Sequence, residues 1–159
     1  GLSPRADRRR PLPRLVRRPG VVIAPPTPAV GEAFALPAGL QAEISLVRTV
    51  EPPVISQQEA IDIVRAGVSI PLGDDVSVTY GLGTLGHRDP GSGAWIGAQN
   101  VPLPNGAVLD RVASRPMWIV DYGNVDVPTS PGVPAANHAV YVVDAQSRAV
   151  LQVFFYREA

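Results

Sequence analysis

Apolar and polar side chains alternate in several short stretches of this chain, which is the pattern of half-buried β-strands. Residues 40–46 alternate in this way until Glu51-Pro52-Pro53 ends the pattern, and residues 76–80 alternate again. The compact apolar run over residues 117–120 is typical of a central strand. The sequence therefore predicts a strand at each of these three places.

A helical pattern lies between the first two strands. Ser56 and Glu59 have the spacing of a capping box, in which the Ser hydroxyl accepts from the Glu backbone N–H and the Glu carboxylate bonds back to the Ser amide. Apolar residues then recur on one helical face, at Ala60, Ile61, Val64 and Val68. We predict one short amphipathic helix over residues 57–66, which ends at Gly67.

Near the C-terminus, two apolar arms at residues 139–143 and 149–156 flank a polar turn, which predicts a β-hairpin. On the second arm, Leu151, Val153 and Phe155 form a wholly apolar face. We expect this face in the core of the domain.

Aromatic residues are favoured at binding hot spots, although most aromatic side chains simply pack in a core. We expect Trp118 and Phe155 to be core residues. Phe154 and Tyr156 lie on the mixed face of the last strand. We therefore predict that these two side chains contact a partner.

Glycine and proline are frequent in residues 81–115, which we interpret as a long loop. Residues 1–39 are rich in proline, and the first twenty also in arginine, so we expect an extended arm and linker there. Residues 40–159 are then one domain of ordinary size. We predict the α+β class, with an antiparallel sheet of about four to five strands and one amphipathic helix packed on it.

Several of these segments match one family. They are ISQQEAI at residues 55–61, VVDA at 142–145, and VL at 150–151. Together they resemble the PepSY domain, in which a capped helix precedes strands and the chain ends in a hairpin. Residues 117–121 are also similar to the Pro-x-Trp-x-Val strand of secreted relatives of that family.

The resemblance implies an extracytoplasmic protein with a non-catalytic role, such as binding or restraining a peptidase. No catalytic residue is carried over, because the family has none. The turn of the hairpin departs from the family pattern. Ser147 and Arg148 stand where the family has Thr-Gly, and arginine does not adopt a positive φ as readily as glycine does.

The net charge of zero is the sum of two opposed parts. All fourteen cations are arginine; seven of them, with the single acid Asp7, give residues 1–20 a charge of +6, and the rest of the chain carries −6. Such an arm could pair with carboxylates of a neighbouring subunit or contact an anionic membrane surface. Nucleic acid is a weaker candidate, because no aromatic residue for stacking precedes Phe34. The partner-binding candidates in the arm are Arg8, Arg9, Arg10, Arg14, Arg17 and Arg18.

The residue types needed for catalysis, metal binding or cofactor binding do not occur in a supportive pattern. The chain has no cysteine, and its two histidines, His87 and His138, lack the spacing of a zinc site. Asp121, Asn124 and Asp126 lack the closing Glu of a calcium loop. The glycine pattern over residues 81–86 is not followed by a helix that would bind a pyrophosphate. We therefore predict no catalytic residues, no metal and no cofactor.

We predict a non-catalytic extracytoplasmic domain that binds a protein, through restraint of a peptidase or contact with an envelope partner. The alternative is a structural subunit of a larger assembly, docked through its arginine-rich arm. A second alternative is a small hydrolase that uses Ser92, Asp89 and His138. No apolar run is long enough for a transmembrane helix, since the longest covers only residues 20–26.

Overall fold

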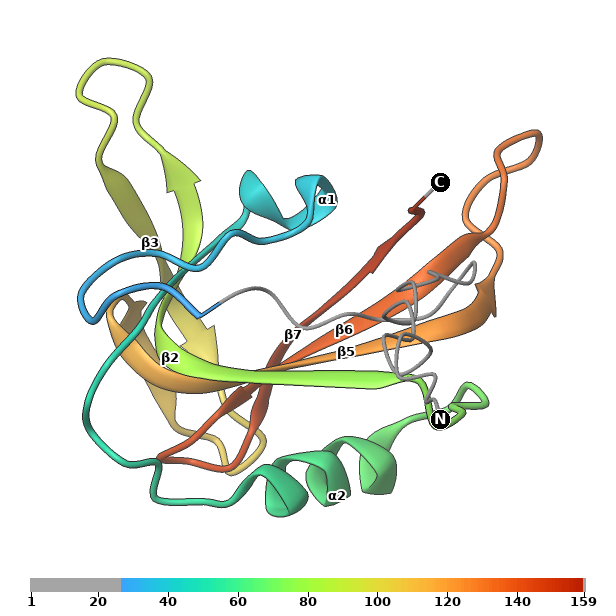
Figure 1. Ribbon diagram of the computed structural model, residues 1–159, viewed down its shortest axis with the longest axis horizontal. Coiled ribbons are helices and arrows are strands. Elements are labelled where there is room, and N and C mark those ends of the chain that lie inside the picture. The colour runs from blue at the N-terminus through green and yellow to red at the C-terminus, as the bar shows by residue number, and fades with distance from the viewer. Residues whose placement is uncertain (1–26, 159) are drawn as a thin grey trace, which may run out of the picture.

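The computed structural model describes residues 27–158 (Figure 1). Within this range, seven strands form one antiparallel sheet in the order β4-β3-β2-β5-β6-β7, and β1 pairs with β2 off this path. The elements in chain order are α1 (Ala38–Gln41), β1 (Ile44–Val47), α2 (Gln57–Gly67), β2 (Val76–Arg88), β3 (Trp95–Pro102), β4 (Val108–Val112), β5 (Arg115–Val127), β6 (Ala136–Asp144) and β7 (Val150–Tyr156).

The predicted fold class is wrong, because the structure is mostly β. We expected one helix on a sheet of about four to five strands, whereas the described residues form seven strands and two short helices. A strand occurs at each predicted place, but the first covers only Ile44–Val47, since Ala38–Gln41 forms helix α1 instead of the start of a strand. Strands β3 and β4 lie within residues 81–115, which we had interpreted as a loop. The second half of β2 also lies there and continues to Arg88.

Close packing explains why glycine is common in these strands. A Cβ on Gly83 would lie 2.1 Å from the Sδ of Met117, and a Cβ on Gly86 would lie 1.9 Å from the backbone O of Ile96. A side chain at either position would collide with its neighbours. These glycines therefore mark places where strands approach each other closely, and we had mistaken them for signs of a loop.

The β3–β4 hairpin had a local signal that our interpretation missed. Asn105-Gly106 lies between two apolar runs, and this dipeptide is a strong indicator of a tight hairpin turn. In the structure Gly106 has a φ of +89°, and the Asn105 side chain accepts a hydrogen bond from Ala107 N. Leu103 N donates to Ala107 O and so closes the turn.

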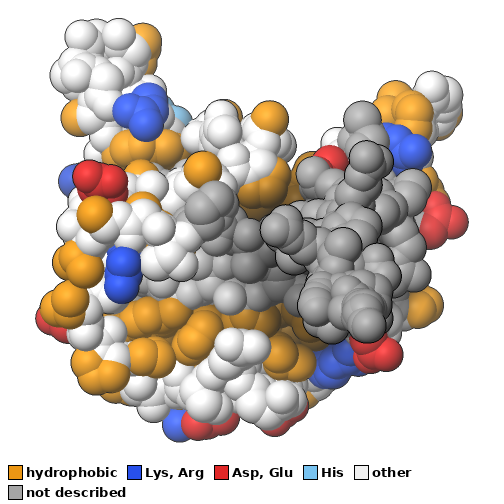
Figure 2. Space-filling model, viewed as in Figure 1, with side chains coloured by type: hydrophobic (Ala, Val, Ile, Leu, Met, Phe, Trp, Pro, Cys, Tyr) orange, Lys and Arg blue, Asp and Glu red, His pale blue; other side chains and the backbone are white. Residues whose placement is uncertain are grey.

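Helix α2 covers one face of the sheet. Its predicted capping box is confirmed: Glu59 N donates to the Ser56 hydroxyl (3.0 Å), and Ser56 N donates to the Glu59 carboxylate (3.3 Å). Ala60 and Val64 of α2 are buried in a first core cluster that also holds Trp118 from β5. Figure 2 shows hydrophobic side chains gathered along the line where α2 meets the sheet.

Helix α1 lies on the opposite face of the sheet (Figure 1), and strand β1, which pairs with β2, adds side chains to that face. They contribute Leu40, Ile44 and Leu46 to a second core cluster. We had assigned residues up to 39 to the linker, but the described part of that stretch already packs on the domain. Phe34 N donates to Leu46 O (2.8 Å), and Leu36 is buried in the second cluster. The packed structure therefore begins before residue 40.

Candidate functional site

The two ends of the sheet approach each other on the side of the second core cluster. Strand β7 is the last strand of the sheet and pairs with β6, and none of the described residues forms a strand on its other edge. At the opposite end, Val101 of β3 and Leu109 of β4 pack against the second core cluster, and so do Leu151 and Phe154 of β7. The curled sheet thus brings its first and last strands to one cluster without pairing them.

Two hollows lie where β7 and the β3–β4 hairpin face each other. The first, of about 190 Å³, is lined by Glu43, Leu85, Gly86, Ala98, Val101, Leu151, Gln152 and Phe154. The second, of about 160 Å³, is lined by Leu103, Pro104, Asn105, Ser147, Arg148 and Ala149. Both hollows have the β2–β3–β4 side of the sheet on one wall and β7 or its preceding turn on the other. We call these two hollows together the seam.

The seam has an acidic and a basic end. Glu43 lines the first hollow, where the aliphatic and aromatic side chains gather. Arg148 lines the second hollow, beside the β3–β4 turn. Arg148 Nη1 also lies 3.1 Å from Glu59 Oε2, but both side chains are largely exposed, at 61% and 44%. An exposed pair of this kind is weak, so Arg148 stays available to a ligand in the seam.

Side-chain hydrogen bonds hold the turn before β7, which forms one wall of the seam. Asp144 accepts hydrogen bonds from the backbone N–H and from the hydroxyl of Ser147. Burial alone would raise the pKa of Asp144, but hydrogen bonds from Arg115 and Ser147 outweigh it and hold the pKa below its usual value. Arg148 adopts a φ of +64°, the conformation that glycine would supply at this position in the PepSY pattern. Arginine thus takes a backbone conformation here that glycine adopts more readily.

The structure separates the two aromatic residues that we predicted as partner contacts. Phe154 lines the first hollow of the seam. The Tyr156 hydroxyl donates to Asp121 Oδ2 (2.8 Å), and its ring stacks on His138 at 4.5 Å between centroids. Phe154 is thus placed for contact with a ligand in the seam, while Tyr156 contributes to an internal polar cluster.

Of the two aromatic residues expected in the core, only Trp118 is there. Trp118 is 7% exposed, and its Nε1 donates to Ile55 O (3.2 Å), whereas Phe155 is 45% exposed, so that prediction was wrong. A register shift between β6 and β7 at Val142/Val143 interrupts the alternation. Leu151 consequently packs on the second cluster and Val153 on the first.

The residues of the hydrolase alternative are not joined into a catalytic arrangement. The Ser92 hydroxyl donates to Asp89 Oδ2 (2.7 Å) in the exposed β2–β3 turn, and this bond is the main cause of a lowered Asp89 pKa. His138 is buried on β6, with its Nδ1 3.0 Å from Asp121 Oδ1 and its Nε2 3.1 Å from Glu158 Oε2. Because each ring nitrogen faces a carboxylate, neither is directed at Ser92.

Burial also affects three tyrosines on the α2 side of the sheet. Desolvation raises the pKa of Tyr80, Tyr122 and Tyr141 above its usual value. The Tyr80 ring lies 5.1 Å from that of Trp118, and Tyr122 meets Tyr141 edge-on at 6.3 Å. A raised pKa keeps these phenols protonated near neutral pH. Their role is therefore packing in the core and not acid–base chemistry.

The remaining predictions concern the arginine-rich arm, metal binding and a membrane span. The six arginines of the arm, from Arg8 to Arg18, lie outside the described residues. Within residues 27–158, no group of three or more His, Asp or Glu side chains is arranged to hold a metal ion. No helix in the same part of the chain is long and apolar enough to cross a membrane.

Comparisons with known proteins found no relative of this chain. No family model matches it, and neither a curated protein nor a solved structure does. The resemblance to the PepSY family therefore stays a prediction that rests on the residues quoted for it.

Proposed function

We propose that the protein is a non-catalytic domain that binds an extended segment of a partner protein in the seam. The outer edge of β7 carries this proposal, because no described strand pairs with it and Phe154 beside it lines an apolar hollow. An exposed strand edge accepts an extended peptide through backbone hydrogen bonds, and neighbouring pockets select its side chains. Both components of that binding mode are present along β7.

The hollows set the expected sequence of the bound segment. The first hollow gives room to an apolar side chain between Val101, Leu151 and Phe154. Glu43 at this hollow favours a neighbouring cation in the segment, and Arg148 at the second hollow favours an acid. The preferred segment is therefore extended, with an apolar anchor and opposite charges toward its two ends.

We place this function outside the cytoplasm, with a secreted peptidase or an envelope protein as the partner. This part of the proposal is supported only by the resemblance of residues 55–61 and 142–151 to the PepSY family. The structure adds one compatible detail, which is that Arg148 adopts the positive φ of the family's turn glycine.

A peptide-display selection on the full chain tests the binding mode. We expect enriched peptides to share an apolar anchor and to slow hydrogen exchange of backbone amides in residues 150–156. Phe154→Ser should weaken the best peptide at least tenfold, whereas Phe155→Ser should not, because Phe155 lies on the opposite face of β7. Circular dichroism must show that both variants remain folded.

Three results would contradict the proposal. The first is the absence of any enriched peptide, and the second is protection that maps to residues away from β7. The third is equal loss of binding in the Phe154 and Phe155 variants. If the chain instead forms dimers whose β7 amides are protected, the edge serves self-assembly, and the partner-binding proposal fails.

A further inference from the structure

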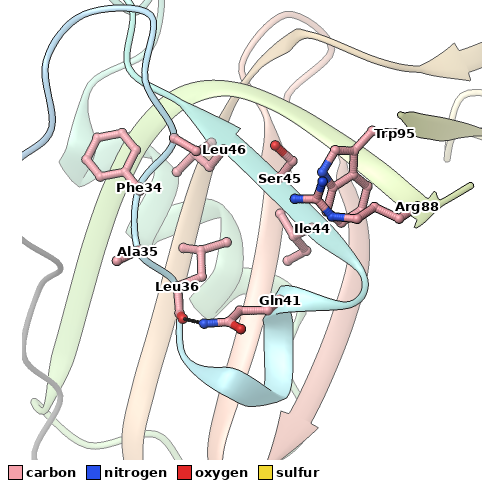
Figure 3. A pocket seen from close by; sticks show the side chains of 10 residues that line it. Phe34, Ala35, Leu36, Gln41, Ile44, Ser45, Leu46, Arg88 and Trp95 are labelled. Atoms are coloured by element: carbon pink, nitrogen blue, oxygen red, sulfur yellow. Dashed lines mark hydrogen bonds between the residues drawn. The ribbon is translucent and has the colours of Figure 1, made fainter. Parts of the chain in front are cut away.

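A third pocket, of about 270 Å³, lies beside β1 and shares no lining residue with the seam. Its walls come from the segment before α1, from β1, and from the adjoining ends of β2 and β3. Figure 3 shows Arg88 and Trp95 together at one end, next to Ser45, and Phe34 and Leu36 at the other. The pocket is therefore polar and cationic at one end and apolar at the other.

Arg88 is held in place at the cationic end. Its guanidinium carbon lies 5.2 Å from the centroid of the Trp95 ring, and its Nη1 donates to Gly93 O (3.1 Å). Arg88 and Trp95 are also register partners across β2 and β3. A cation held over an aromatic face is oriented before a ligand arrives, which lowers the entropy lost on binding.

The charge of Arg88 is not neutralised within the described part of the chain. None of the carboxylates there forms an ion pair with Arg88. The adjacent acid, Asp89, instead accepts from the backbone N–H and the hydroxyl of Ser92. The guanidinium therefore retains donors that can pair with an anion in the pocket.

The rest of the pocket offers an apolar surface with few polar groups. The Gln41 side chain donates to Leu36 O (2.8 Å), which ties α1 to the wall of the pocket. Phe34 is half-buried, and Leu36 and Ile44 are buried in or against the second core cluster. A ligand that fills this end needs an apolar body, because charged groups would lose hydration there without gaining a partner.

We propose that this pocket binds a carboxylate attached to a small apolar body. The carboxylate pairs with Arg88, and the body rests against Phe34 and Leu36. A single cation suits the single charge of a carboxylate better than the nearly double charge of a phosphate. The ligand is either a free small carboxylic acid or the C-terminal residue of a peptide. The inference does not depend on the seam or its proposed function.

Nuclear magnetic resonance of the full chain tests this inference, because its two tryptophans give separate indole N–H signals. The probes are N-acetyl-leucine and its neutral counterpart, N-acetyl-leucinamide. We expect the acid to shift the Trp95 signal saturably and to leave that of buried Trp118 in place. The amide should bind at least tenfold more weakly. Equal binding of acid and amide, or no saturable shift of Trp95, overturns the inference.

Variants identify the group that binds the carboxylate. Arg88→Gln should weaken N-acetyl-leucine at least tenfold, and Arg88→Lys should restore only part of the loss, because lysine lacks the paired donors of arginine. Arg111→Gln is the matched control, since it removes the same charge from another exposed strand position. Equal weakening in the Arg88 and Arg111 variants would show an effect of net charge alone and would overturn the assignment.

A second pair of probes separates the two sources of ligand. An acetylated pentapeptide that ends in leucine carries the same terminal carboxylate on a longer chain, and its amide is the control. Tighter binding of the peptide acid than of N-acetyl-leucine indicates a peptide C-terminus, and weaker binding indicates a small free acid. Both outcomes support the carboxylate site, and neither bears on the seam.

Discussion

Arg115 of β5 binds the carboxylate of Asp144 at the end of β6 through two hydrogen bonds, from Nε to Oδ1 (2.6 Å) and from Nη2 to Oδ2 (3.0 Å). The Asp144 side chain is fully buried, while that of Arg115 is 22% exposed. Paired geometry of this kind is the strongest form of the arginine–carboxylate interaction. It fixes the turn that forms one wall of the seam.

We predict that Asp144 makes the stability of the fold sensitive to acid. Because the pKa of Asp144 is lowered in the folded protein, its contribution is present above the unfolded-state pKa of about 4 and is lost as the pH falls through the folded value. Asp144→Asn should cost about 2–3 kcal/mol of unfolding free energy at pH 7. Urea titrations should show this difference shrinking below about pH 4, whereas exposed Asp126→Asn should show little difference at either pH.

Replacement of Arg148 by glycine should stabilise the protein. Arg148 has a φ of +64°, which costs about 1 kcal/mol for a residue with a side chain and little for glycine. We expect Arg148→Gly to gain roughly 0.5–1 kcal/mol, after loss of the weak pair with Glu59. Arg148→Ala is the control, because it loses the same pair and keeps the unfavourable φ. Thermal unfolding that ranks alanine above glycine would contradict this account.

The two glycines Gly86 and Gly67 should respond to alanine in opposite directions. A Cβ on Gly86 would lie 1.9 Å from a backbone oxygen of β3, so Gly86→Ala should destabilise the protein by roughly 2–3 kcal/mol. Nothing lies within 4 Å of the corresponding position at Gly67, the last residue of α2. There alanine should add about 0.5–1 kcal/mol. Denaturant midpoints of the two variants measure both effects.

The two histidines should differ in their importance for stability. His138 is 1% exposed, lies between Asp121 and Glu158, and stacks on Tyr156. His138→Ala should cost about 2–5 kcal/mol, because it empties the space of a buried ring and leaves the Asp121 carboxylate with only the Tyr156 hydroxyl as a side-chain partner. His87→Ala, at an exposed position, should change stability by less than about 0.5 kcal/mol. Similar losses in both variants would show that the buried cluster is not a stabilising unit.

The sequence predicted well those helices and strands whose signals lie within the element itself. The capping box at Ser56 and Glu59 specified the start of α2, and the apolar arms of the C-terminal hairpin specified β6 and β7. These signals suffice because the partners lie only a few residues apart. Trp118 was also placed correctly, since its apolar neighbours predict a buried strand.

The features that the sequence did not predict depend on contacts between distant parts of the chain. Gly83 indicates a loop when read alone, but its role follows from Met117, which lies on the neighbouring strand. Leu151 and Val153 pack on opposite clusters because of a register shift between β6 and β7 at Val142/Val143, which no alternation within β7 reveals. The seam and the Arg88 pocket also could not be predicted from the sequence, for the same reason. Both bring together residues from segments that are separate in the sequence.

Strand β2 has a consequence for how the molecule unfolds. Residues 76–83 of β2 pair with β5, whereas residues 82–88 pair with β1 and β3, so one continuous strand belongs to both halves of the sheet. Loss of order in either half removes pairing from the backbone that supports the other. We therefore expect one cooperative unfolding transition, and no cut within β2 should leave a fragment that is stable by itself.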